Sequence, residues 1–304
     1  MARSILPVDS FTSSMPSLSA TLALLKPVTW FPPMWAFACG AVCVGTASAD
    51  ALLLALGGIL LAGPLICGTS QAVNDWFDRE VDAINEPQRP IPSGRVPGHW
   101  GLYIAVLWTG LSLLWAILLG SWVVLPAALG LLLAWVYSAP PLRLKRSGWI
   151  GPAVVALCYE GLPWLTAAIL LSGEAPGGRL LAIALLYSVG AHGIMTLNDF
   201  KSVEGDRATG IRSLPATLGP ERAARIACAV MFLPQTVVVY LLWQWDGHGY
   251  AGLVALMLLM QICLAPRLLR SPRDNAAWYS ATGVGLYVTG MMIGAFALRH
   301  LNGG

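Results

Sequence analysis

The chain has 304 residues, of which 57% are hydrophobic and 11% charged, and its mean hydropathy is +0.68. Soluble domains carry roughly 25% charged residues, so the composition excludes an ordinary soluble enzyme, a disordered chain and a disulfide-stapled secreted module. Most of the surface must face a lipid bilayer, and a net charge of +3 is too small to indicate a nucleic-acid partner. The six cysteines lie in apolar runs without a CxxC pair, which predicts small buried side chains.

Taken in chain order, the apolar stretches long enough to cross a bilayer predict an all-α integral membrane protein with nine transmembrane helices. They cover residues 24–46, 51–73, 100–119, 121–138, 150–171, 180–198, 223–243, 249–265 and 277–298. Residues 1–20 have one Arg and no apolar core, which predicts a cytoplasmic N-terminal tail and not a cleaved leader. We expect residues 21–304 to form a single transmembrane domain.

The basic residues are unevenly divided between the two ends of these spans. Sixteen of the eighteen Lys and Arg residues fall in the tail and the even-numbered connections, whereas Arg179 and Arg299 fall on the opposite side. Because cytoplasmic loops carry an excess of Lys and Arg, we expect a cytoplasmic N-terminus and a C-terminus on the other side.

Two acidic motifs follow the second and sixth spans with the same spacing. In NDWFDREVD, a continued helix would hold four side chains within roughly 100° of one another, and these are Asn74, Asp75, Asp78 and Asp82. NDFKSVEGD repeats the spacing with Asn198, Asp199, Ser202 and Asp206, and the basic residues Arg89 and Arg212 follow the two motifs. The repetition predicts two four-helix units, about 21–145 and 150–270, with an added helix at 277–298.

Three carboxylates within two helical turns repel one another, and a hard divalent cation relieves that repulsion. Oxygen ligands favour Mg²⁺ or Ca²⁺ over zinc, and the spacing differs from that of an EF-hand. Mg²⁺ keeps coordination sites for substrate phosphates, so two facing motifs with nearby Arg and Lys indicate a diphosphate clamp. A solvated acidic loop is the alternative for one motif alone, and it is less plausible for two copies in a membrane protein.

A diphosphate clamp in a membrane favours a polyprenyl diphosphate substrate, with its tail among the apolar spans. Breaking the C1–O bond would leave an allylic cation beside the departing diphosphate. Trp76, Tyr137 and Phe200 are candidates to shield that cation through their ring faces, although interface anchoring explains each one singly. Glu160, inside the fifth span, is a candidate for function that would be protonated or paired with a cation from a loop; alternatively the span starts later and Glu160 is a structural residue near its end. For His192 we favour a hydrogen-bonded core histidine over a ligand of a pigment metal.

These segments also carry a family resemblance. Through NDWFDREVD, NEPQRPIPSGR, YSAPPLRLK and NDFKSVEGDRATGIRSLP, the sequence resembles the UbiA-type intramembrane prenyltransferases over nearly its whole length. LLKPVTWFPPMWAF, INEPQRPIPSG and NDFKSVEGD are similar to the chlorophyll synthase branch of that family, and there to the bacteriochlorophyll synthases.

The resemblance implies Mg²⁺-dependent transfer of a geranylgeranyl or phytyl group from its diphosphate to the C17 propionate of bacteriochlorophyllide a. It implies metal ligands at Asp75, Asp78, Asp82, Asp199 and Asp206. It implies catalytic roles for Asp75, Asp78, Arg89, Tyr137 and Lys145. It implies substrate binding by Asn74, Arg89, Lys145, Asn198, Lys201 and Arg212. Many relatives have an acidic residue where this chain has Ser202, which leaves open whether Ser202 or Glu204 contributes.

The resemblance further implies a bacterial inner membrane with a periplasmic C-terminus, and it allows association with other membrane proteins of pigment biosynthesis. Three alternatives remain at this point. A prenyltransferase could use another acceptor, such as chlorophyllide, a quinone precursor or haem. A cation or phosphate transporter would favour inverted repeats and a midplane site, whereas the two units here run parallel with motifs at the span ends. A structural pigment-binding protein would need ligands inside the spans, where only His192 is convincingly placed.

Overall fold

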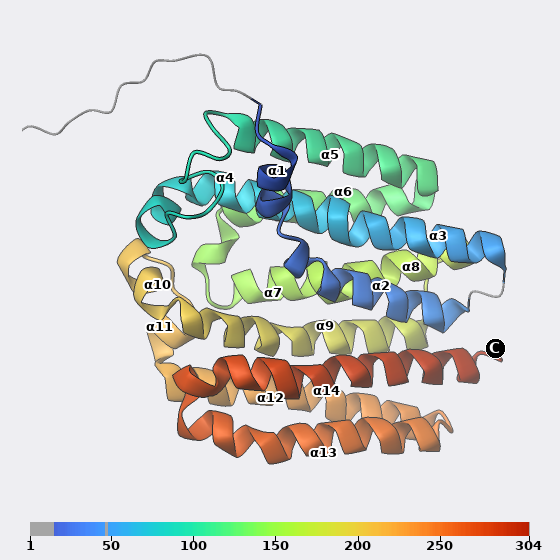
Figure 1. Cartoon of the computed structure of the whole chain (residues 1–304). Helices are drawn as coiled ribbons and strands as arrows, with labels where there is room; N and C mark the ends of the chain where they lie inside the picture. Colours follow the sequence, from blue (N-terminus) through green and yellow to red (C-terminus); the bar gives the residue numbers. More distant parts are fainter. Residues whose placement is uncertain (1–14, 46–47, 304) are drawn as a thin grey trace, which may run out of the picture.

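The computed structural model describes residues 15–45 and 48–303, so most of the expected N-terminal tail lies outside the described residues (Figure 1). The described part of the chain is a bundle of helices, and its β-pairing is limited to one isolated bridge between Ser147 and Arg212. The predicted all-α fold is confirmed.

The helices of the first half include a long second segment in which a π-helical turn, η2, joins α3 to α4. The elements are α1 Leu18–Leu25, η1 Pro27–Thr29, α2 Phe31–Val44, α3 Ala49–Leu60, η2 Leu61–Cys67, α4 Gly68–Asn85, α5 Trp100–Leu119 and α6 Ser121–Ser138. The helices of the second half include a corresponding π-helical turn, η4, between α7 and α8. The elements are η3 Leu144–Arg146, α7 Ile150–Ala156, η4 Leu157–Gly161, α8 Leu162–Ser172, α9 Gly178–Asn198, η5 Asp199–Lys201, α10 Val203–Thr209, α11 Leu214–Leu218, α12 Pro220–Gln244, α13 His248–Arg270 and α14 Pro272–Leu301.

Among the described residues, eight helical segments are long and apolar enough to cross a membrane, and the first expected span is a bent pair, Leu18–Thr29 and Phe31–Val44, with an angle of 55°. A count of nine spans is therefore compatible with the structure. The bend follows from local chemistry. Lys26 adopts a left-handed conformation with φ 48°, and the Pro27 that follows it has no backbone N–H to continue the helix.

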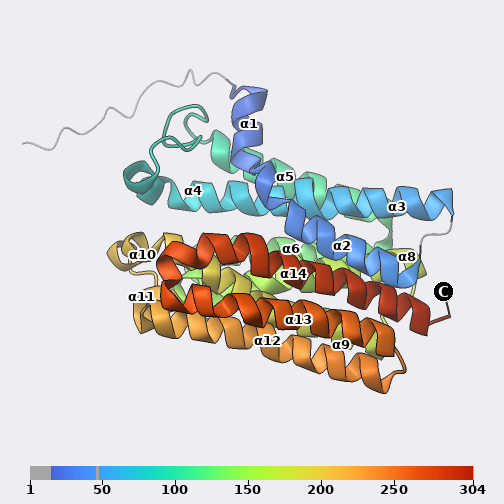
Figure 2. The same cartoon turned by 60° about the horizontal axis from the view of Figure 1, so that its bottom comes forward.

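The two ends of the bundle differ. In Figures 1 and 2 the C-terminal end of α4, α10 and α11 lie at one end of the bundle, and the chain's C-terminus lies at the other. Both acidic motifs thus meet at the same end. Many large apolar side chains remain exposed, as expected of a surface that faces lipid; Leu53, Trp122 and Leu125 are examples.

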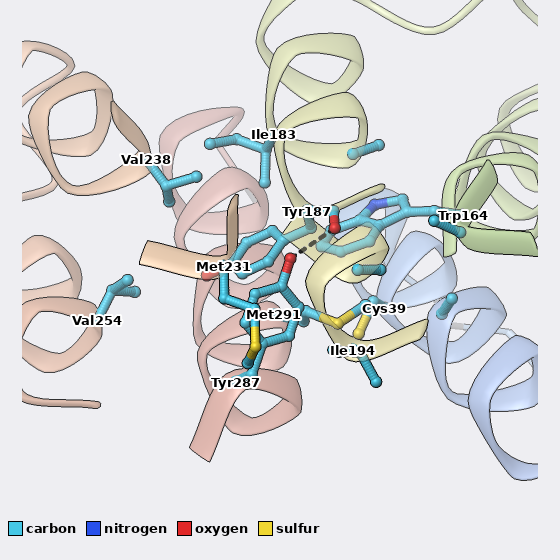
Figure 3. Packing of buried hydrophobic residues seen from close by; sticks show 14 of the residues in the cluster. Cys39, Trp164, Ile183, Tyr187, Ile194, Met231, Val238, Val254, Tyr287 and Met291 are labelled. Atoms are coloured by element: carbon cyan, nitrogen blue, oxygen red, sulfur yellow. Dashed lines mark hydrogen bonds between the residues drawn. The ribbon is translucent and has the colours of Figure 1, made fainter. Parts of the chain in front are cut away.

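Close helix contacts and aromatic stacking build the interior of the second half. A Cβ on Gly40 of α2 would lie 2.2 Å from the backbone oxygen of Trp164, so glycine is required where α2 meets α8. Figure 3 shows the neighbouring core, where the ring of Trp164 stacks on Tyr187 with centroids 5.9 Å apart. Tyr287 meets the Tyr187 ring edge-on and donates a hydrogen bond to its backbone oxygen. This tightly packed region supports α9, which carries the second acidic motif.

Candidate functional site

A cavity of about 580 Å³ opens among the helices that carry the acidic motifs. Its polar lining comes from both halves of the chain and consists of Asn74, Tyr137, Lys145, Asn198, Asp199, Lys201, Asp206 and Ser213, among others. The rest of the lining is largely apolar and includes Ile66, Leu133, Val155 and Ile194. The cavity therefore has one polar region with both cations and carboxylates and a long apolar extension.

The first motif is helical as predicted, because α4 continues to Asn85. Asp75 is 1% exposed, and its Oδ1 accepts hydrogen bonds from Lys26 Nζ at 2.6 Å and Arg89 Nη1 at 3.4 Å. Arg89 Nη1 also donates to Asp82 Oδ2 at 2.8 Å. Oδ2 of Asp75 is buried without a hydrogen-bond partner among the described residues. Asp75 and Asp82, on one edge of this helical face, are thus held by cations from the connections that follow α1 and α4.

The other edge of the same helical face turns toward the cavity. Asp78 accepts hydrogen bonds from Arg143 Nη2 at 2.9 Å and from Lys145 Nζ at 2.5 Å. Asn74 Nδ2 lies 3.3 Å from Ser138 Oγ. Of the four side chains in the first motif, Asn74 is the one that lines the cavity. Asp78 contributes indirectly by holding Lys145, which does line it.

Glu86 and Lys145, two charged residues in connections between the spans, have shifted pKa values. Arg89 donates to both oxygens of Glu86 at 2.7 and 2.8 Å, and these hydrogen bonds hold the pKa of Glu86 below its usual range. Burial lowers the pKa of Lys145, and Asp78 opposes that shift. Lys145 is 8% exposed, so its charge is balanced by direct contact with a carboxylate.

The second motif has the same spacing as the first but does not continue as a regular helix. Helix α9 ends at Asn198, the turn η5 follows, and Ser202 is non-helical with φ −116° before α10 begins. The hydroxyl of Ser202 donates to the Asp199 backbone oxygen at 3.2 Å and to Asp206 Oδ2 at 3.1 Å. Serine hydroxyls compete in this way with helical backbone bonds. The break brings Asp199 and Asp206 together at the cavity.

These two aspartates have different surroundings. Asp206 also accepts a hydrogen bond from Ser213 Oγ at 2.5 Å, and burial raises its pKa despite the two hydroxyl donors. The Asp199 carboxylate lines the cavity and makes no ion pair or side-chain hydrogen bond within the described residues. Lys201 lines the same cavity.

Two other charged candidates lie apart from this cavity. Arg212 is exposed and is absent from the cavity lining, while its backbone N–H donates to the Arg146 oxygen at 3.0 Å. Glu204 is exposed and pairs with Arg273 at 2.7 Å. The charge of Glu204 is therefore satisfied on the outer surface.

Among the three aromatic candidates, Tyr137 lines the cavity. Trp76 carries the Arg79 guanidinium 4.3 Å from its ring centroid, and Phe200 is buried at 5% exposure outside the cavity lining. Sequence reasoning missed Tyr159, which lines the cavity and accepts a hydrogen bond from Gln71 Nε2 at 3.0 Å. The available signal was Gln71, the partner of Tyr159: it lies about one helical turn before Asn74 on the same helix and therefore on the same side.

The two candidates inside the spans, His192 and Glu160, differ in their contacts. His192 Nε2 lies 3.1 Å from the Trp149 oxygen, in agreement with a hydrogen-bonded core histidine. Glu160 is 3% exposed within η4, its Oε2 has no hydrogen-bond partner among the described residues, and no cation within that part of the chain pairs with it. Neither residue lines the cavity.

The donor chemistry of the cavity fits Mg²⁺. Asn198, Asp199 and Asp206 offer oxygen atoms only, and Mg²⁺ is usually bound by one or two carboxylates together with water and substrate phosphates. Within residues 15–45 and 48–303 no group of three or more His, Cys, Asp or Glu side chains converges on one point.

Comparison with known proteins gives a consistent result. The model of the UbiA prenyltransferase family matches residues 29–288. The chain is 56% identical to the bacteriochlorophyll synthase 33 kDa chain of Cereibacter sphaeroides, with 95% of both chains covered. It is 36% identical to the chloroplastic chlorophyll synthase of Oryza sativa subsp. japonica, over 92% of this chain and 76% of that protein. The structure of a UbiA homolog from Archaeoglobus fulgidus bound to GPP and Mg²⁺ has a TM-score of 0.68 at 20% identity, covering 88% of this chain and 99% of the other, and shows the shared fold.

Proposed function

The chain belongs to the UbiA prenyltransferase family, and from that membership we propose that it transfers a geranylgeranyl or phytyl group from its diphosphate to the C17 propionate of bacteriochlorophyllide a. The observation that carries the choice of acceptor is the 56% identity to a bacteriochlorophyll synthase chain over 95% of both chains. The membrane-spanning helices, the cavity and the paired motifs agree with an enzyme that works at the membrane boundary.

The charge distribution of the cavity supports binding of a prenyl diphosphate. Lys145 and Lys201 supply cations at the polar region, and the amides of Asn74 and Asn198 supply further hydrogen-bond donors. The apolar extension would hold the isoprenoid tail. When bound, Mg²⁺ would neutralise charge on the departing diphosphate. Asp199 and Asp206, with the Asn198 amide oxygen, are the residues that would hold it.

The reaction asks the protein to position and to stabilise charge. Breaking the C1–O bond of the donor places positive charge on the allylic carbon and negative charge on the diphosphate. Tyr137 at the cavity wall presents a ring that stabilises a nearby cation. The acceptor is a carboxylate at neutral pH, so no side chain has to remove a proton from it. Lys145 lines the cavity, and the hydrogen bond that its ammonium group donates to Asp78 holds it in place.

We also propose that the acidic motifs face the cytoplasm of a bacterial inner membrane and that the C-terminus is periplasmic. The uneven distribution of Lys and Arg supports this orientation. A cysteine placed near the C-terminus should react with a membrane-impermeant thiol reagent that is added to cells whose outer membrane has been made permeable and whose inner membrane is intact.

The direct test uses membranes that contain the protein, supplied with Mg²⁺, bacteriochlorophyllide a and geranylgeranyl diphosphate. We expect release of diphosphate and formation of the pigment ester. Chlorophyllide and a quinone precursor serve as competing acceptors. Faster transfer to either of them than to bacteriochlorophyllide would overturn the proposed acceptor, and ion flux in liposomes without any prenyl transfer would overturn the reaction class.

A further inference from the structure

A further pair of polar side chains lies in the cavity wall, just before the first acidic motif. Gln71 of α4 and Tyr159 of η4 both line the cavity and are half-buried. Gln71 Nε2 donates a hydrogen bond to the Tyr159 hydroxyl oxygen at 3.0 Å. The two halves of the chain thus meet at a direct polar contact, and we call these two residues the amide–phenol pair.

The amide–phenol pair holds donor hydrogens that the protein itself does not use. A tyrosine hydroxyl has one hydrogen and a glutamine amide has two. The contact between the two residues uses one amide hydrogen. Within the described residues, the second amide hydrogen of Gln71 and the phenolic hydrogen of Tyr159 are donated in no hydrogen bond. Both are therefore free for a group that occupies the cavity.

The position of Tyr159 is set from more than one element. The Cys67 thiol lies 3.4 Å from the Tyr159 hydroxyl oxygen and 3.3 Å from the Thr29 backbone oxygen. Cys67 ends the π-helical turn η2, and Tyr159 belongs to the π-helical turn η4. Such turns are rare and occur frequently at functional sites. The phenol is thus held from α4 and η2 at once.

The amide–phenol pair lies at the boundary between the polar region and the apolar extension of the cavity. Helix α4 runs toward the end of the bundle where the acidic motifs meet (Figure 1). Gln71 precedes Asn74 by three residues on this helix, an axial rise of ~4.5 Å away from that end. The apolar lining residues Ala62 and Ile66 come earlier still. The unused donors therefore lie about one helical turn inside the polar region.

The chemistry of the two substrates decides which group fits this place. The prenyl tail has no acceptor atom, and the diphosphate has the cations Lys145 and Lys201 in the polar region. C1 of the donor is bonded to the diphosphate, so it lies beside that region. A carboxylate that attacks C1 has to come within about 3–3.5 Å of it. Carboxylate oxygens accept several hydrogen bonds, and their charge strengthens each of them.

We propose that Gln71 and Tyr159 bind the attacking carboxylate of the acceptor, through the second amide hydrogen and the phenolic hydrogen. The inference rests on the proposed function, since it concerns the acceptor of that reaction. One carboxylate oxygen forms the bond to C1 while the C1–O bond to the diphosphate breaks, and the diphosphate leaves with the electron pair. Both residues keep their protons and position the carboxylate beside C1.

The test uses Tyr159→Phe, which removes the hydroxyl and keeps the ring. Changes in pigment absorption measure the binding of bacteriochlorophyllide a, and of its C17 propionate methyl ester, to the purified full chain without a prenyl donor. We expect the wild-type chain to prefer the free carboxylate. In Tyr159→Phe that preference should fall at least about fivefold, because a hydrogen bond to a charged group is worth more than one to a neutral group. A purely structural role would weaken the binding of both pigments equally.

Steady-state rates give a second measurement. Tyr159→Phe should raise the KM for bacteriochlorophyllide and leave the KM for geranylgeranyl diphosphate within about twofold of wild type, since only the acceptor loses a contact of this size. Gln71→Met should act in the same direction. Tyr279→Phe is the matched control, because the Tyr279 hydroxyl donates to the Gln261 backbone oxygen at 3.2 Å and the residue is outside the cavity lining.

An unchanged preference for the carboxylate in Tyr159→Phe and Gln71→Met would overturn the proposal. If Tyr159→Phe does not fold, Gln71→Met decides by the same two measurements. A raised KM for geranylgeranyl diphosphate with an unchanged KM for the pigment would assign the pair to the donor and would also overturn it. Failure of the proposed function gives a different result, because the wild-type chain would then form no pigment ester at all.

Discussion

The ammonium of Lys26 lies 2.6 Å from Oδ1 of Asp75 and joins the bend between α1 and α2 to the middle of α4. Asp75 is almost completely buried, and its second cationic contact, Arg89, is more distant at 3.4 Å. The first acidic motif therefore depends on a residue about fifty positions earlier in the chain for its charge balance.

Replacing Lys26 by Met should lower the free energy of unfolding by about 1–3 kcal/mol. The buried Asp75 carboxylate would then keep its contact with Arg89, at 3.4 Å, and lose the shorter one. The measurement is the thermal unfolding midpoint in detergent, with Lys26→Arg as the charge-preserving control. In the double variant with Asp75→Asn, the loss should be smaller than the sum of the two single losses. Additive losses would show that the two side chains do not interact.

Asp78→Ala and Asp75→Ala should each lower turnover at least about a hundredfold, a loss of roughly 3 kcal/mol in the barrier, because each aspartate holds cations beside the site: Asp75 contacts Lys26 and Arg89, and Asp78 contacts Arg143 and Lys145. For Asp78 the loss includes release of Lys145 from its position at the cavity. Initial rates of ester formation, normalised to folded protein, measure the effect. Glu204→Ala is the control, since Glu204 pairs with Arg273 on the outer surface and should retain activity. Wild-type rates in either aspartate variant would contradict the assignment.

Removal of divalent metal should abolish ester formation, and added Mg²⁺ should restore it, because Asp199 and Asp206 both offer carboxylate oxygens to the cavity and neither forms an ion pair within the described residues. Asp199→Asn should raise the Mg²⁺ concentration for half-maximal rate by about tenfold, since it replaces a carboxylate ligand by a neutral amide. Titration of the rate with Mg²⁺ gives both results. Full activity in excess chelator would argue against a metal at this cavity.

Ser202→Asp should change the Mg²⁺ dependence of the rate more than the preference for prenyl length. Ser202 donates to Asp206 Oδ2, and a carboxylate there would repel Asp206 until a cation binds. The two curves to compare are rate against Mg²⁺ and the ratio of rates with donors of different length. An unchanged Mg²⁺ curve would place Ser202 outside the influence of the metal.

Gly40→Ala should destabilise the fold by about 1–3 kcal/mol or more, because its Cβ would overlap the backbone oxygen of Trp164. Gly285→Ala on α14 is a matched control with open space around the added carbon. Unfolding midpoints in detergent compare the two variants. A Gly40→Ala midpoint equal to that of wild type would mean that α2 and α8 can separate without loss.

Much of the fold followed from the sequence because hydropathy and helix length reflect the thickness of the bilayer. The shared face of the first motif followed from its residue spacing, because α4 continues through the motif to Asn85. The bend in the first span was not predicted, because the left-handed backbone of Lys26 gives no periodic signal.

The partners of the motifs were harder to predict than the motifs. Lys26 and Arg143 both reach their aspartates from left-handed positions in connections, and hydropathy contains no information on such loop geometry. The break at Ser202 depends on a hydroxyl that bonds a carbonyl and a carboxylate at once, a tertiary choice that helical spacing alone does not reveal.

The backbone bond from Arg212 to Arg146 ties the connection after α6 to the connection after α10. Lys145 lies beside one end of this tie and Ser213 beside the other, so both rims of the cavity are fastened together at their polar edge. A substitution that displaces either connection should therefore also disturb the polar lining that the other half of the chain contributes to the cavity.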